Sequence, residues 1–144
     1  MNTTILIAED NPDDVTLIRR AFVKAALPSS LQIVRDGDSA IAYLSGTDGF
    51  EDREAFPFPA LLLLDLKLPR RSGFDILTWI RSHQHLRRLP IVVLTSSREG
   101  GDINRAYELG ANSYLMKPVK FEHLLEMVKT VNQYWIGMNE KPVF

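Results

Sequence analysis

Three acidic residues follow two apolar runs of the sequence, and together they could hold a metal ion or accept a phosphoryl group. Glu9 and Asp10 come directly after the run 5–8, and Asp65 follows four consecutive leucines. Carboxylates that are packed together repel one another and raise one another's pKa unless a cation joins them. Mg²⁺ relieves this repulsion because it binds carboxylate oxygens together with phosphate oxygens and water. We therefore expect Mg²⁺ at these residues and a nucleophilic Asp65 that forms an acyl phosphate.

Two other polar residues end later apolar runs and would complete such a site. Thr95 follows the run 91–94, and Lys117 follows the run 113–116. Lys117 supplies a fixed positive charge and Thr95 a hydroxyl donor, which suits phosphoryl transfer because its catalysis consists mostly of positioning and charge neutralisation. Each residue alone is more often an ordinary strand end. Their occurrence as a set with the acidic residues favours the functional interpretation.

The elements that must position these residues are five strands that alternate with helices. Apolar runs predict strands over 4–8, 31–34, 61–64, 91–94 and 113–116, and helical spacing of apolar residues predicts helices between them. Such alternation is typical of an α/β fold with a parallel sheet covered on both faces. The carboxyl ends of parallel strands share one edge of the sheet. We therefore expect the five polar residues to converge there.

The first predicted helix has a clear start signal. Asn11 can cap it, Pro12 suits its first position, and Asp13 and Asp14 complement the positive end of the helix dipole. We interpret both aspartates as dipole partners, although Asp13 could also reach a metal ion. Gly110 is expected to end a later helix as its C-terminal cap.

Length and composition limit the classes of protein that this chain can represent. The 144 residues suit one domain, which we place over 1–136 with a tail over 137–144. The net charge of −1 gives no reason to expect a nucleic-acid partner. No apolar run approaches the roughly 20 residues of a membrane span, and we find no leader. Cysteine is absent, which excludes disulfides and thiolate chemistry and fits a cytoplasmic location.

Two surface features have an open interpretation. The loop 46–59 is long for a compact domain, and such loops tend to be functional or disordered. Five arginines are expected to form a solvated surface, with contact to an acidic partner such as a kinase domain as the alternative. These arginines are Arg70, Arg71, Arg81, Arg87 and Arg88.

The ordered set of motifs resembles the receiver domain of two-component response regulators. The set consists of Glu9-Asp10, the leucines before Asp65 with Pro69 and Gly73, Val-Leu-Thr95-Ser96, and Lys117-Pro118. The resemblance implies a doubly wound, flavodoxin-like sheet with strand order 2-1-3-4-5. It also implies that Asp65 is the phosphoacceptor.

The same resemblance implies roles for the residues around the acceptor. Glu9, Asp10, Asp65 and the backbone carbonyl of Lys67 would hold Mg²⁺. Thr95 would hydrogen-bond the phosphoryl group and Lys117 would pair with it. Tyr114 falls at the position of the family's switch aromatic, and the bond between Lys117 and Pro118 is expected to be cis. Lys67 departs from the pattern, because many receivers have a shorter polar residue there.

A narrower resemblance rests on the opening Glu-Asp-Asn-Pro-x-Asp and on Leu-x-Leu-Pro-x-x-x-Gly after the acceptor, together with the acidic loop and the tail. These features resemble stand-alone regulators that partner phytochrome kinases. We therefore expect a histidine kinase of the phytochrome type as phosphodonor, and no output domain. We also expect a homodimer through the face formed by the helix over 103–109, the strand over 113–116, the last helix and the tail.

Two other functions are open from the sequence. A phosphorylation-independent binding module could keep the fold and lose the chemistry, but the intact set of acidic residues, threonine and lysine argues against it. A phosphohydrolase that uses an aspartyl phosphate usually needs a second carboxylate two residues after the nucleophile, where this chain has Lys67. We therefore expect a signalling switch that catalyses only its own phosphorylation and dephosphorylation, and no other enzymatic activity.

Overall fold

The five apolar runs form the strands of one parallel sheet. In this computed structural model, which describes residues 3–144, the strands lie in the order β2-β1-β3-β4-β5, so the predicted α/β fold and strand order are confirmed. None of the helices within these residues is long and apolar enough to cross a membrane. The elements in chain order are β1 (Thr4–Ala8), α1 (Pro12–Lys24), β2 (Ser30–Val34), α2 (Gly37–Ser45), β3 (Leu61–Leu64), α3 (Gly73–Ser82), β4 (Ile91–Thr95), α4 (Gly100–Glu108), β5 (Ser113–Met116), α5 (Phe121–Val131) and the π-helix η1 (Asn132–Met138).

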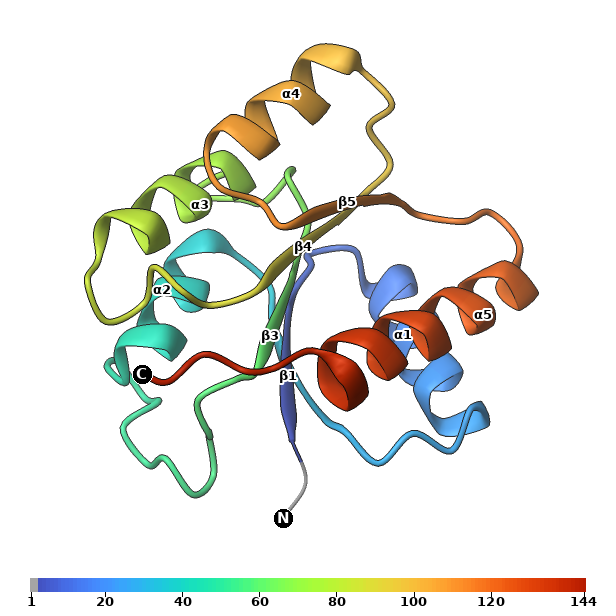
Figure 1. The fold of residues 1–144 in the computed structure, drawn as a ribbon, viewed down its shortest axis with the longest axis horizontal. Helices are drawn as coiled ribbons and strands as arrows, with labels where there is room; N and C mark the ends of the chain where they lie inside the picture. The colour runs from blue at the N-terminus through green and yellow to red at the C-terminus, as the bar shows by residue number, and fades with distance from the viewer. Residues whose placement is uncertain (1–2) are drawn as a thin grey trace.

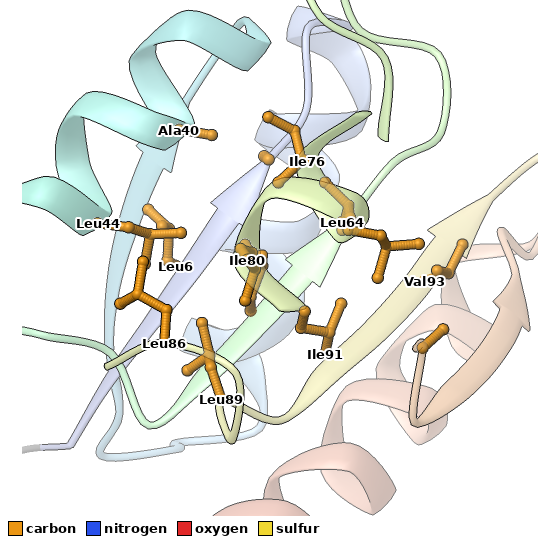
Figure 2. Packing of buried hydrophobic residues seen from close by; sticks show 14 of the residues in the cluster. Leu6, Ala40, Leu44, Leu64, Ile76, Ile80, Leu86, Leu89, Ile91 and Val93 are labelled. Atoms are coloured by element: carbon orange, nitrogen blue, oxygen red, sulfur yellow. The ribbon is translucent and has the colours of Figure 1, made fainter. Parts of the chain in front are cut away.

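The four consecutive leucines of β3 are buried on both faces of the sheet. Successive side chains of a strand point to opposite faces, so Leu62 and Leu64 enter one core cluster and Leu61 and Leu63 the other. Helices α2, α3 and α4 cover the first face, and α1 and α5 cover the second (Figure 1). Figure 2 shows Ile80 of α3 in the first cluster, close to the leucines of the sheet. This burial holds β3 at the centre of the sheet and directs the residue after it to the sheet edge.

Local sequence signals end and begin the elements near that edge. The Asn11 side chain accepts hydrogen bonds from two backbone amides of α1, and Pro12 is the first helical residue, as predicted. Gly110 lies just past α4 with φ +109°, which confirms its role in ending that helix. Gly73 begins α3, and a Cβ there would lie 2.4 Å from the carbonyl oxygen of Asp65. Only glycine therefore allows α3 to start so close to the end of β3.

The loop 46–59 is ordered by aromatic packing. Tyr43 donates a hydrogen bond of 2.7 Å from its hydroxyl to a carbonyl of the loop. The ring centroids of Tyr43, Phe50 and Phe56 lie 5.0 to 6.0 Å apart. Arg53 donates hydrogen bonds to backbone carbonyls at both ends of this aromatic cluster. Burial raises the pKa of Tyr43 to about 12.

The last segment of the chain crosses the amino ends of β1 and β3 (Figure 1). Helix α5 continues as η1 (Asn132–Met138), so the helical path ends later than expected and the extended tail is shorter. Arg88 donates a 2.9 Å hydrogen bond to the carbonyl of Val143. The rings of Phe58 and Phe144 lie 5.0 Å apart, which joins the tail to the 46–59 loop.

The expectation of a purely solvated arginine cluster does not hold for Arg81. Its guanidinium is partly buried and donates hydrogen bonds to the carbonyls of Gly110 at 2.7 Å and of Leu89 at 2.8 Å, and to the Asn112 side chain at 3.0 Å. These bonds join the end of α3 to the starts of β4 and β5. Because the bonds connect residues far apart in sequence, no local pattern distinguished Arg81 from its neighbours.

Candidate functional site

Three carboxylates meet at the carboxyl edge of the sheet. Glu9 and Asp10 follow β1, Asp65 follows β3, and one carboxylate oxygen of each lies within 4.8 Å of the others. Glu9 and Asp65 are buried, whereas Asp10 is exposed. The predicted convergence of these three residues is therefore observed. Their spacing suits a hard divalent cation, which takes oxygen ligands.

Lys117 lies at the centre of the acidic group. Its Nζ is 2.9 Å from an oxygen of Asp65 and 2.9 Å from an oxygen of Asp14, and it also forms an ion pair with Glu9. The side chain is 14% exposed. The lysine therefore neutralises part of the negative charge and holds the acceptor carboxylate in position.

Asp14 is the residue of this site that sequence reasoning missed. Asp13 and Asp14 both suit the first turn of a helix, and the sequence offers no sign of which one faces the sheet edge. The packing of α1 on the sheet decides it, and brings Asp14 to Lys117. Asp13 is not among the carboxylates that come together at this edge, so nothing in the described residues supports the alternative of a metal contact for it.

Burial and Lys117 set the protonation of the two buried carboxylates. Burial would raise the pKa of Asp65, but the hydrogen bond and charge of Lys117, with smaller contributions from Thr95 and the Lys67 amide, lower it below its ordinary value. Burial raises the pKa of Glu9 to about 7, with a further contribution from the charge of Asp65. Burial acts to lower the pKa of Lys117, yet its bonds to the carboxylates raise it above the ordinary value. Asp65 is thus an ionised carboxylate at neutral pH, which a nucleophile requires.

Thr95 and Tyr114 lie beside the acidic group on β4 and β5. Thr95 ends β4 and is 1% exposed, and its side chain lowers the pKa of Asp65. The Tyr114 hydroxyl donates a 3.0 Å hydrogen bond to the carbonyl of Ser97, and the Ser97 hydroxyl donates to Asp102 of α4 at 2.6 Å. Tyr114 therefore connects β5 to the segment that follows Thr95.

The segment around Lys67 and the bond before Pro118 complete the edge. The backbone amide of Lys67 donates a 3.3 Å hydrogen bond to Asp65, and its side chain is exposed. The bond between Lys117 and Pro118 is trans, because residues 3–144 contain no cis peptide bond. The expectation of a cis bond is therefore wrong for this structure. The trans form of a bond to proline is favoured by about 0.5–1 kcal/mol when packing does not select cis.

Comparison with known proteins identifies the family. Residues 5–129 match the response regulator receiver domain. The probable methanogenesis regulatory protein FilR2 of Methanothrix harundinacea is 39% identical over 138 residues, which cover 96% of this chain and 86% of FilR2. Response regulator Rcp1 of Synechocystis sp. is 36% identical over 132 residues, which cover 92% of this chain and 88% of Rcp1.

Solved structures agree with this match over nearly the whole chain. The phosphorylated cyanobacterial phytochrome response regulator RcpA has a TM-score of 0.90 at 34% identity, covering 99% of this chain and 100% of RcpA. The Mn²⁺-bound form of Rcp1 has a TM-score of 0.86 at 34% identity, covering 98% of this chain and 99% of Rcp1. These matches explain why the acidic group, the threonine and the lysine lie together at one sheet edge. This chain belongs to the response regulator receiver domains, with phytochrome-associated response regulators among its relatives.

Proposed function

We propose that this protein is the phosphoacceptor of a two-component pathway, and that a histidine kinase transfers a phosphoryl group to Asp65. The observation that carries the proposal is the contact of Lys117 with an ionised Asp65 beside Glu9 and Asp10. This arrangement combines a nucleophile, a fixed cation and a cation-binding group of oxygens. Family membership supports the same assignment.

The residues at the edge fit a Mg²⁺ ion. Glu9, Asp10 and Asp65 would hold it with their carboxylates, and Lys67 with its backbone carbonyl. When bound, the ion would neutralise charge on the phosphoryl oxygens, which together with positioning is most of what phosphoryl transfer requires. Support comes from the close spacing of the three carboxylates and from the relative Rcp1, whose structure was solved with Mn²⁺.

The chain's own residues position the transfer. A carboxylate oxygen of Asp65 forms a bond to phosphorus as the bond between phosphorus and the kinase imidazole nitrogen breaks, and the electron pair stays on that nitrogen. Lys117 pairs with the phosphoryl oxygens, and the Thr95 hydroxyl donates to them. We infer that the same residues also position the later hydrolysis of the acyl phosphate on Asp65. We further infer that the protein does not hydrolyse phosphate esters.

The output of this switch is the face formed by α4, β5 and α5. Helix α4 has one buried residue, Ala106, and begins with two glycines, so moving it requires little free energy. A phosphoryl group that attracts Thr95 shifts the segment after β4, to which Tyr114 is bonded through Ser97. We infer that Tyr114 changes its position together with this segment, and that phosphorylation raises the population of a conformation that already exists without it.

The partners follow from the relatives and from this surface. RcpA is described as a cyanobacterial phytochrome response regulator, which supports a phytochrome-like kinase as the donor for this chain. Exposed aromatic residues on the face and near the tail, Tyr107 and Tyr134, support a homodimer there. A cytoplasmic location is part of the same proposal, and so is the absence of a nucleic-acid partner, which is in keeping with a net charge of −1.

Phosphorylation tests the proposal directly. Incubation with Mg²⁺ and acetyl phosphate, followed by intact mass measurement, should show one added phosphoryl group. Asp65→Asn should remove the added mass, because the amide is a poor nucleophile, whereas Asp48→Asn in the 46–59 loop should retain it. Label that persists in Asp65→Asn would contradict the assignment. Timed transfer from autophosphorylated histidine kinases, phytochrome-like kinases among them, would then identify the donor.

A further inference from the structure

A cavity at the amino edge of the sheet, opposite the acidic group, is lined by three arginines. Its volume is about 450 Å³. Its walls come from the end of α3, the segment before β4, the turn before β5, and η1 with the tail. The lining residues that matter here are Arg81, Arg87, Arg88, Trp135, Asn139 and Glu140.

The arginines of this cavity form no ion pair among residues 3–144, although Glu140 is part of its wall. None of the three arginines forms an ion pair with the described carboxylates. Arg81 uses its N–H groups on backbone carbonyls and Asn112, so it contributes charge but few free donors. The Arg88 side chain donates one hydrogen bond, to the carbonyl of Val143, and the Arg87 side chain donates none within the described part of the chain. Arg81 is partly buried, whereas Arg87 and Arg88 are exposed and keep free N–H donors at the wall of the cavity, where an anion can accept from them.

The unused donors define the chemistry of that anion. The guanidinium group presents a planar fork that matches phosphate and carboxylate oxygens. We propose that this cavity binds a small phosphate-bearing molecule, with Arg87 and Arg88 contacting its phosphate oxygens and Arg81 adding to the local positive potential. Trp135 provides an aromatic wall for a ring on the ligand. The volume lies in the range of small-molecule sites, about 300–1,000 Å³.

The site is separate from the phosphoacceptor. The cavity includes Pro90, immediately before β4, whereas Thr95 at the other end of β4 belongs to the acidic group. Five strand residues span about 16 Å at roughly 3.3 Å each. A ligand here would therefore leave Mg²⁺ and the phosphoryl group undisturbed. It would contact the tail at Asn139, and so hold the tail against the segment before β4.

Fluorescence of Trp135 offers a direct test. The chain has two tryptophans, so Trp79→Phe leaves Trp135 as the reporter, and the indole N–H resonance of Trp135 in the unsubstituted protein gives a second readout. We would titrate pyrophosphate, and separately ATP, into protein in EDTA at constant ionic strength. We expect a saturable change. Arg87→Ala/Arg88→Ala should weaken binding at least about tenfold, because each charge-assisted hydrogen bond contributes strongly.

Matched variants distinguish specific binding in the cavity from nonspecific attraction to positive charge elsewhere on the surface. Arg19→Ala/Arg20→Ala removes the same charge from α1 and should leave the affinity unchanged, as should Asp65→Asn. Glu140→Gln removes a carboxylate from the cavity wall and should tighten binding about twofold. Tighter binding of ATP than of pyrophosphate would identify a nucleotide, and equal binding a phosphate group alone.

Three results would overturn the proposal. The first is a response that does not saturate, or that disappears when the titration is repeated at a higher fixed ionic strength. The second is an equal loss in Arg19→Ala/Arg20→Ala. The third is saturation by a poly-glutamate peptide but by neither phosphate compound, which would assign the surface to an acidic protein partner instead. None of these results bears on phosphorylation of Asp65, so the two proposals can fail separately.

Discussion

At the scale of single residues, the site is a balance between one lysine and three carboxylates. Lys117 contacts Glu9, Asp14 and Asp65 at once. Glu9 and Asp65 are both buried, so without the lysine their mutual repulsion and their loss of hydration would destabilise the folded state. Asp14 is the most exposed of the three partners, and it contacts only the lysine among the site residues. Its contribution is therefore the easiest to isolate.

Asp14→Asn should lower the free energy of unfolding by about 1 kcal/mol at pH 7 without Mg²⁺, because it weakens a charge-assisted hydrogen bond at a partly exposed position. Urea unfolding curves measure the effect. Asp13→Asn is the matched control, because it removes a neighbouring charge in the same helical turn that does not reach Lys117. Equal losses in the two variants would show that both aspartates act only on the helix dipole.

At the scale of elements, α3 and α4 differ in how firmly they are attached. Helix α3 buries Gly73, Ile76, Leu77 and Ile80 and begins against the backbone of Asp65. Helix α4 buries only Ala106 and begins with glycines that have open space around them. The first helix is thus a rigid support for the acceptor, and the second is the element that a phosphoryl group can move at low cost.

Two glycine substitutions test this difference with opposite signs. Gly73→Ala should destabilise the protein by about 1–3 kcal/mol, because its Cβ would overlap the backbone after β3. Gly101→Ala in α4 should stabilise it by about 0.5–1 kcal/mol, because alanine favours the helix and nothing lies nearby. Thermal or urea unfolding measures both. A loss of stability in Gly101→Ala would show that α4 is packed more tightly than its contacts indicate.

At the scale of the whole molecule, the two edges of the sheet carry opposite charge. The carboxyl edge gathers Glu9, Asp10 and Asp65, and the amino edge gathers arginines beside the tail. The single positive charge of Lys117 does not neutralise all the negative charge of the carboxylates at this edge. Binding of a divalent cation should therefore stabilise the entire fold, since a ligand that binds only the native state shifts unfolding by mass action.

Addition of Mg²⁺ at ten times its dissociation constant should raise the free energy of unfolding by about 1.4 kcal/mol, and EDTA should reverse the change. Differential scanning fluorimetry measures the accompanying rise in Tm. Asp10→Asn should abolish the rise without a large effect on the metal-free protein, because Asp10 is exposed. Asp13→Asn should retain it. A full rise in Asp10→Asn would remove Asp10 from the cation site.

Several features of this protein could be predicted from sequence because they depend on neighbours along the chain. The run Leu61–Leu64 indicated a buried central strand, and Asn11 and Pro12 indicated the start of α1. The position of Asp65 at a strand end followed from strand period and parallel topology alone. The order of the strands came from the family resemblance rather than from any residue pattern.

Other features depended on contacts between distant residues, and only the tertiary structure decided them. Asp14 reaches Lys117 because the packing of α1 on the sheet turns this side of the helix toward the carboxyl edge. Arg81 is partly buried because α3 ends over the starts of β4 and β5. The cavity at the amino edge exists because the tail returns across the sheet to Arg88. Such contacts join residues separated by 29 to 103 positions, and their geometry depends on packing that local sequence periodicity does not encode.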